Sequence, residues 1–264
     1  MNKPKIQLAH ANGFPARTYS KLFSYLENDF EINFIERHGH NPQFLVSDSW
    51  EFLAKELQIE IENRYKGEPI IGIGHSLGGI LHFLVASEHP RLYSQIILLD
   101  APILSRFSSF ALKNLKSLNM IDRFSPAKIT RFRRNLWKNQ EEAVEHFRQK
   151  PKFAAFDEDV LRDYVKHGTV ECEKGIELFF KPSIEAKIYQ TIPHNLPKIG
   201  KTFDLPINYI GGTNSLEAKL AGFKSMKKRF NIKFDFIEGS HLFPFENPKA
   251  TAVAIQKNHR KLVI

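Results

Sequence analysis

Short apolar runs recur in the first hundred and the last sixty residues of the chain, separated by longer stretches of mixed polarity. The runs are four to six residues long, which is typical of strands buried on both faces of a parallel sheet. The six candidate strands are Lys5–Ala9, Glu31–Glu36, Ile70–Ile73, Gln95–Asp100, Leu205–Ile210 and Ile232–Ile237.

Helical patterns fill the intervals between these runs. Apolar residues recur at helical spacing in Trp50–Tyr65, whereas Leu77–Glu88 is apolar on nearly every side, as a buried helix would be, and ends before Pro90. Leu216–Phe230 and Pro248–His259 have the pattern of surface helices. Strands that alternate with helices predict right-handed βαβ units, and therefore an α/β protein with a parallel sheet.

The alternation stops between Leu104 and Gly200. This segment shows no clear strand but several helix-like pieces rich in Lys, Arg and Phe, so we expect a helical insertion over one edge of the sheet. The core domain then consists of residues 1–103 and 201–264, and the insertion of residues 104–200. Nine of the 23 Phe residues lie in the insertion, and we expect most of them to build its own core rather than an apolar tunnel.

The formal charge of +9 is unevenly distributed along the chain. Residues 1–103 carry −3, residues 104–195 carry +5 and residues 196–264 carry +7. No zinc-finger spacing, RNA-binding signature or helix-turn-helix accompanies the basic clusters, so we expect solvated helix faces and no nucleic-acid partner. The basic stretch 131–138 could also adsorb to an anionic lipid surface, although a solvated face is the favoured interpretation.

The cysteine content and the N-terminal segment indicate in which cellular compartment we expect the protein. Cys172 is the single cysteine, so the chain has no disulfide framework and no cysteine zinc site is expected. The first residues lack the apolar run of a signal peptide, and no stretch approaches the roughly 18 apolar residues of a membrane span. We therefore expect a cytoplasmic protein without a membrane span.

The most specific pattern is Gly74-His75-Ser76-Leu77-Gly78, placed between a candidate strand and an apolar helix. A serine at such a sharp turn has a strained backbone that exposes its hydroxyl at the carboxyl edge of the sheet. Glycines two positions before and after it leave room for the turn. The N–H of Leu77, at the start of the helix, can bind an anion.

Together with HANGFP upstream and GSHLFPFENP downstream, this motif resembles the α/β-hydrolase superfamily over essentially the whole chain. The resemblance implies a three-layer α/β fold in which the insertion is the cap over the active site. Only nine residues precede His10, so we expect the first two strands of the usual eight to be missing. We expect a sheet of six parallel strands with Glu31–Glu36 at its exposed edge.

The resemblance also implies roles for particular residues. Ser76 would be the nucleophile, and His241, which follows the last candidate strand, would be the general base. Leu77 and Asn12 would supply the two N–H groups of the oxyanion hole, and the Asn12 side chain could add a third donor. We expect the side chain of His75 to face away from the site and to pack.

The acid of the triad is open between two positions. Most of the family carries it after the penultimate strand, where this chain has Asn214, and an amide cannot stabilise the imidazolium, which in a protease triad lowers turnover about 10⁴-fold. Some relatives carry the acid after the strand that follows the elbow helix, where this chain has Asp100. Asp100 is the favoured acid, and the competing interpretation is that it merely caps the turn that follows its strand. Asn214 is the alternative acid position, and Glu217 is a weaker third candidate.

The resemblance implies a serine hydrolase, of carboxylesterase type, for a small-molecule ester with an apolar acyl or alcohol part. No metal or organic cofactor is expected. Thioesterase, lactonase, acyltransferase and C–C hydrolase activities stay open because the pocket shape decides among them. A hypothesis of another class is a catalytically impaired fold that binds a small ligand, because Asn214 replaces the usual acid.

Overall fold

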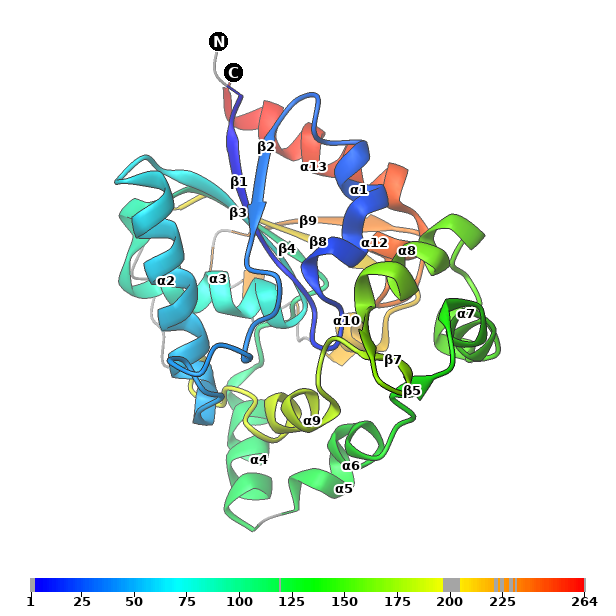
Figure 1. Cartoon of the computed structure of the whole chain (residues 1–264). Coiled ribbons are helices and arrows are strands. Elements are labelled where there is room, and N and C mark those ends of the chain that lie inside the picture. The colour runs from blue at the N-terminus through cyan, green and yellow to red at the C-terminus, as the bar shows by residue number, and fades with distance from the viewer. Residues whose placement is uncertain are drawn as a thin grey trace.

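A six-stranded parallel sheet forms the centre of the computed structural model (Figure 1). The structure describes residues 3–263 except 119, 197–204, 221–222, 224–225, 228–229 and 231. The strand order is β2-β1-β3-β4-β8-β9, and every neighbouring pair is parallel, which confirms the predicted sheet and its β2 edge. The strands are β1 (Lys5–Ala9), β2 (Glu31–Phe34), β3 (Ile70–His75), β4 (Tyr93–Leu99), β8 (Ile207–Gly212) and β9 (Ile232–Ile237).

Helices cover both faces of this sheet, so successive residues of a central strand are buried on opposite sides. Ile70 of β3 packs in the cluster that contains Leu53 and Leu81, and Ile71 packs in the cluster that contains Ile255. Such two-sided burial explains why the central strands are continuous apolar runs. One layer contains α2 (Glu51–Tyr65) and α3 (Leu77–Glu88), and the other contains α1 (Ser20–Ser24), α12 (Phe243–Glu246) and α13 (Pro248–Val263).

Short single-turn helices complete the connections of the core and of the cap. They are η1 (Ala16–Tyr19), η2 (Asp48–Trp50), η3 (Pro90–Leu92) and η4 (Pro151–Phe153). Of the predicted helix Leu216–Phe230, the structure describes α10 (Leu216–Leu220), and much of the remainder lies outside the described residues. The predicted domain boundary near residue 200 also lies outside them. Among the described residues, no helix is both long and apolar enough to cross a membrane.

The insertion is not wholly helical, which corrects the prediction for residues 104–200. Its helices are α4 (Arg106–Ser117), α5 (Ile121–Phe124), α6 (Ala127–Arg131), α7 (Gln140–Arg148), α8 (Glu158–Gly168) and α9 (Pro182–Gln190). Between them, β5 (Leu136–Trp137), β6 (Thr169–Cys172) and β7 (Gly175–Leu178) form an antiparallel sheet in the order β5-β7-β6. Strands of two to four residues are too short for their alternation to be recognised in the sequence.

The aromatic residues of the cap fall into two groups. Phe147, Phe153 and Phe156 are buried and contact one another in series, with ring centroids 5.0 and 5.1 Å apart, as expected of a cap core, whereas the buried Phe180 packs edge-on against His10 and His40 of the core domain. The prediction does not hold for four others. Phe107, Phe110, Phe124 and Phe132 are exposed.

Close packing of α3 against β1 sets the position of the turn at Ser76, and Gly78 makes it possible. A Cβ atom at Gly78 would lie 1.9 Å from the carbonyl oxygen of Ala9, a backbone atom of a central strand that cannot move aside. We predict that Gly78→Ala lowers the free energy of unfolding by about 3 kcal/mol or more. Urea denaturation measures the loss.

Gly168 at the end of α8 provides the matched control, because a Cβ atom there would meet its nearest neighbour, Thr18, at an ordinary 3.8 Å. Gly168→Ala should change the stability by less than about 1 kcal/mol. Equal stability of the two alanine variants would contradict the tight contact between α3 and β1.

Candidate active site

Ser76 occupies the sharp turn between β3 and α3 with φ 52° and ψ −112°, an unfavourable backbone region for a residue with a Cβ atom. Its N–H donates to the carbonyl of Leu99 at 2.9 Å, which ties the turn to the end of β4. Such strain costs about 1–3 kcal/mol and persists only where the surrounding structure imposes it. The predicted strand–serine–helix context is therefore present.

Asp100 follows β4, is fully buried and also has a positive φ, of 44°. Its Oδ2 accepts hydrogen bonds from His241 Nδ1 at 2.6 Å and from Ser215 Oγ at 2.5 Å. Its Oδ1 accepts from the Tyr209 hydroxyl at 3.1 Å and from the N–H of Gly212 at 3.2 Å. Burial alone would raise the pKa of Asp100, but the hydrogen bond and charge of His241, with the Ser215 hydroxyl, bring it below its usual value, so the carboxylate is ionised.

Among the described residues, neither of the other two acid candidates is hydrogen-bonded to the imidazole. Asn214 is exposed, and the hydrogen bond recorded for it runs from its backbone N–H to Gly239. Glu217 places Oε2 3.9 Å from His241 Nδ1 and 3.3 Å from Ser215 Oγ. The structure therefore brings His241 together with Asp100, flanked by Glu217, and leaves Asn214 aside.

Asp100, Glu217 and His241 also present three ligand atoms within 4.8 Å of one another, the one such group among the described residues. His241 Nδ1 and Asp100 Oδ2 already share the 2.6 Å hydrogen bond, so a cation bound to both of these atoms would have to replace it.

The two N–H groups of the expected oxyanion hole belong to adjacent loops. Leu77 is the first residue of α3, where N–H groups have no partner within the helix. Asn12 follows β1, and its side-chain amide donates to the carbonyl of Glu185 in α9 at 3.0 Å. One N–H of the Asn12 side chain therefore binds the cap.

A buried chain of hydrogen bonds connects the three loops around Ser76. The Tyr19 hydroxyl accepts from the N–H of Ala11 at 3.1 Å and donates to His75 Nδ1 at 2.7 Å, and His75 Nε2 donates to the carbonyl of His241 at 2.9 Å. This assignment of protons follows from the partners of each atom. The His75 ring lies beside that of His241, with 5.1 Å between their centroids, and its hydrogen bond fixes the backbone of His241, a role that the sequence pattern does not predict.

No hydrogen bond between the Ser76 hydroxyl and His241 is found among the described residues. In unliganded hydrolases this contact is often longer than in the complex with substrate. Ser76 and His241 are nevertheless held by common neighbours, because His75 precedes Ser76 in the chain and binds the carbonyl of His241.

Charged side chains of the cap lie beside the oxyanion loop. Glu185 is buried, its carboxylate lies against Gly13, and Arg133 Nη2 approaches it to 2.6 Å. Lys152 Nζ lies 5.0 Å from the ring centroid of Phe14. Burial raises the pKa of Glu185, against the opposing charges of Arg133 and Lys152, and burial lowers the pKa of Lys152. The cap thus places three charged side chains, Glu185, Arg133 and Lys152, beside the oxyanion loop and the ring of Phe14.

The comparisons with known proteins agree with this fold. Residues 8–254 match the alpha/beta hydrolase family, and the chain belongs to that family. It is 30% identical over 151 residues to a type I acyl-CoA thioesterase of Penicillium brevicompactum, covering 51% of this chain and 33% of the relative. It is 32% identical over 110 residues to monoglyceride lipase of Mus musculus, covering 39% and 36%. The matches span about a third of each relative's length.

Solved structures share the fold at low sequence identity. E-2-(Acetamidomethylene)succinate hydrolase superposes with a TM-score of 0.79 at 16% identity, over 98% of this chain and 92% of that one. The thioesterase domain from the curacin biosynthetic pathway gives 0.74 at 16% identity, over 97% and 92%. The chain is therefore an α/β hydrolase in fold as well as in sequence.

The buried histidines predict a loss of stability in mild acid. Burial, the largest cause, lowers the pKa of both His75 and His82 to about 3. In the unfolded chain these histidines bind a proton near pH 6.5, whereas in the folded chain they stay neutral at that pH. Their contribution to the free energy of unfolding is therefore fully present above pH 6.5 and is lost progressively as the pH falls below it. Between pH 7 and pH 5 we expect a loss of about 2 kcal/mol for each of the two.

Urea denaturation at both pH values tests this expectation. His82→Asn removes one of the two protons from the balance, so its unfolding free energy should depend less steeply on pH than that of the natural chain. A natural chain equally stable at pH 7 and pH 5 would contradict the neutral buried histidines.

Proposed function

We propose that this α/β hydrolase is a serine hydrolase that cleaves a carboxylic ester with an apolar acyl or alcohol part. The observation that carries the proposal is the His241–Asp100 hydrogen bond of 2.6 Å beside the strained turn at Ser76. An ionised, buried carboxylate on Nδ1 directs the lone pair of Nε2 outward, the tautomer that a general base needs.

In the proposed reaction, Ser76 Oγ attacks the ester carbonyl carbon while His241 Nε2 takes the hydroxyl proton. The N–H groups of Leu77 and Asn12 bind the oxyanion of the tetrahedral intermediate. The C–O bond to the alcohol then breaks, and His241 gives the proton to the leaving oxygen. Water attacks the acyl-enzyme in the same way, which releases the acid and restores Ser76. Asp100 stabilises the imidazolium in both halves.

Two alternatives use the same residues differently. Thioester cleavage requires the same acyl-enzyme, and the matched acyl-CoA thioesterase supports it as a second substrate class. A catalytically impaired, ligand-binding fold follows from the amide at Asn214. The second alternative loses its basis if Asp100 serves His241, because the acid is then supplied from β4 instead.

A fluorophosphonate probe tests the nucleophile. We predict that it labels the natural chain on Ser76, because a hydroxyl activated by His241 attacks phosphorus as it attacks a carbonyl. Ser76→Ala should not be labelled, and mass spectrometry of the labelled peptide identifies the site. Failure of the folded natural chain to react would contradict the proposed hydrolase.

Substitution of the candidate acids tests the triad separately. Asp100→Asn should lower kcat for a p-nitrophenyl ester about 10³- to 10⁴-fold, because the amide favours the wrong tautomer and cannot stabilise the imidazolium. The matched amide-position variant, Asn214→Ala, should change kcat less than about twofold, since no hydrogen bond joins its side chain to His241 among the described residues. Circular dichroism verifies that both variants are folded. The reverse order of effects would assign the role to Asn214.

A further inference from the structure

The outer part of the cap, residues 104–139, is strongly basic. We call this segment the cap tip; it contains α4, α5, α6 and β5. It holds nine Lys and Arg residues and a single acidic residue, Asp122, for a net +8 against +9 for the whole chain. The rest of the cap, residues 140–195, has a net −3. The basic surplus of the cap is therefore confined to the cap tip.

The same segment is unusually apolar at its surface. Of the twelve exposed large apolar side chains among the described residues, six belong to the cap tip. Phe107 is 82% exposed, Ile129 81% and Phe132 76%, so the burial of these side chains contributes almost nothing to the stability of the fold. The six residues are Phe107, Phe110, Leu118, Phe124, Ile129 and Phe132. Monomeric proteins rarely keep such a cluster exposed without an interaction partner.

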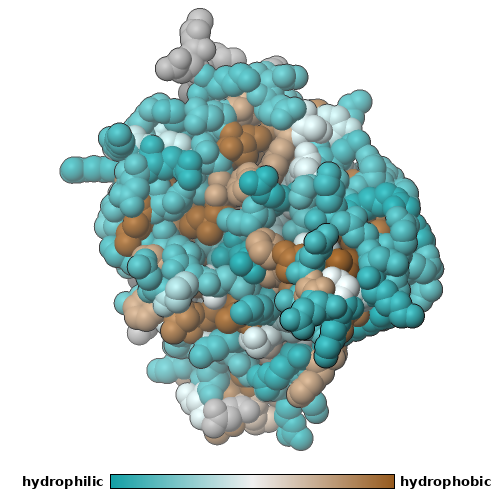
Figure 2. All heavy atoms as spheres, viewed as in Figure 1, coloured by the Kyte–Doolittle hydropathy of each residue, from teal (hydrophilic) through white to brown (hydrophobic). Residues whose placement is uncertain are grey.

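The apolar side chains and the cations occupy the same helices. Phe107 and Phe110 are three residues apart in α4, and Leu118 follows eleven residues after Phe107, which places all three on one side of that helix. Exposed cations lie among the apolar residues of the cap tip, namely Lys113, Arg123, Lys128, Arg131 and Arg134. Apolar and charged atoms are also mixed at the surface of this end of the molecule (Figure 2).

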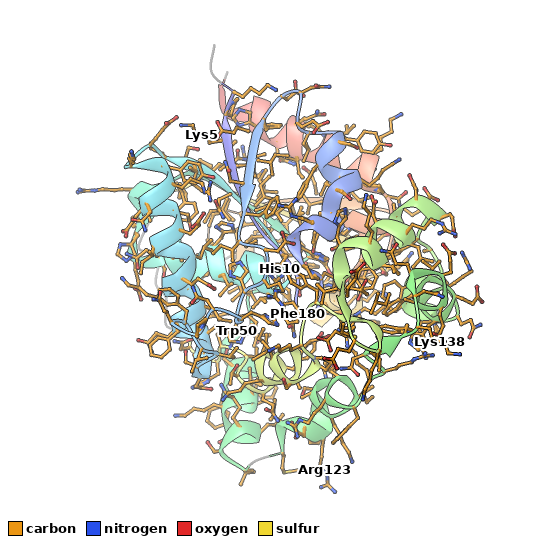
Figure 3. All side chains as sticks on the ribbon, in the orientation of Figure 1. Lys5, His10, Trp50, Arg123, Lys138 and Phe180 are labelled. Atoms are coloured by element: carbon orange, nitrogen blue, oxygen red, sulfur yellow. The ribbon has the colours of Figure 1, made fainter. Side chains whose placement is uncertain are left out.

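The arrangement in space leaves this surface open. In Figure 1 the three helices form the end of the molecule remote from the two termini, and α9 separates them from the sheet. Arg123, labelled in Figure 3, points away from the body of the protein. Lys116 of α4 donates to the carbonyl of Ile192 and pairs with Asp48, which ties the cap tip to the core.

We propose that the cap tip binds the surface of an anionic lipid bilayer. Aromatic and aliphatic side chains can enter the boundary between headgroups and acyl chains while the cations between them contact lipid phosphates and carboxylates. The apolar side chains of the cap tip would then leave water, and its cations would be paired with anionic headgroups. The cap continues through α9, whose Glu185 lies against the oxyanion loop, so adsorption would place the candidate active site near the lipid surface.

Two other occupants fit the surface less well. A second copy of the chain would bring two segments of +8 together, and this repulsion opposes the gain from apolar contact. A nucleic acid would satisfy the cations and stack on the phenylalanines, but the exposed aliphatic residues Leu118 and Ile129 offer no stacking surface. An anionic bilayer can interact favourably with the cations, the aromatic rings and the aliphatic side chains of the cap tip.

Co-sedimentation of the full-length chain with vesicles tests the proposal. Vesicles of phosphatidylcholine with phosphatidylserine should bind the chain, and phosphatidylcholine alone should bind it far less. Lys113→Glu with Lys128→Glu should lower the partition coefficient at least fivefold per residue, because each cation near an anionic surface contributes about that factor. Phe110→Ser with Phe132→Ser should lower it about tenfold or more. All four side chains are exposed, so the variants should fold.

Matched controls keep the same chemistry away from the cap tip. Lys166→Glu with Lys174→Glu, and Phe236→Ser with Val253→Ser, exchange exposed residues elsewhere and should leave binding unchanged. Ser76→Ala should bind like the natural chain, so that lipid binding and catalysis are tested independently. Equal loss in the control pairs would overturn the proposal, as would binding that ignores lipid charge.

Two further outcomes would replace the lipid by another occupant. Absence of vesicle binding, together with a concentration-dependent dimer in sedimentation velocity that Phe110→Ser with Phe132→Ser abolishes, would assign the surface to a second copy. Absence of vesicle binding, with tight, salt-sensitive retention of a DNA or RNA oligomer that depends on Lys113 and Lys128, would assign it to nucleic acid.

Discussion

The candidate active site depends on one buried carboxylate. Asp100 has no contact with solvent, and a charge in such a place is tolerated only when donors surround it. Its four donors come from β8, from the loop that follows it and from the loop of His241, so the end of the sheet and the imidazole are held by the same two oxygen atoms. Removal of the charge would therefore loosen the His241 loop as well as change the tautomer of the ring.

A second, neutral network complements this charged one. The hydrogen bonds from Ala11 through Tyr19 and His75 to the carbonyl of His241 connect the oxyanion loop, the serine turn and the histidine loop. Because burial keeps His75 uncharged, the network adds no positive charge beside His241. The cap contributes from the other side, where the Asn12 side chain binds the carbonyl of Glu185. Residues far apart in the chain are thus fixed relative to Ser76.

The sequence predicts the sheet well, because its strands are apolar runs buried on both faces: Lys5–Ala9 and Ile232–Ile237 coincide with β1 and β9. The turn at Ser76 can also be predicted from the sequence, because the serine, the two glycines and the flanking strand and helix lie within a few residues of one another. The strands of the cap, Tyr19 and Ser215 could not be predicted. Their roles arise from contacts between distant segments, such as the 56-residue separation of Tyr19 and His75, and leave no local periodicity. The choice between Asp100 and Asn214 likewise needed the geometry of neighbouring strands.

The central claim is that Ser76, His241 and the N–H groups of Leu77 and Asn12 act on one substrate carbonyl. A crystal structure of the protein after reaction with diethyl p-nitrophenyl phosphate tests it most directly. The account predicts a phosphoryl group on Ser76 Oγ, with one oxygen within hydrogen-bond distance of the N–H groups of Leu77 and Asn12 and with His241 Nε2 directed at Oγ. An adduct on another residue, or an oxygen directed away from those two N–H groups, would contradict it.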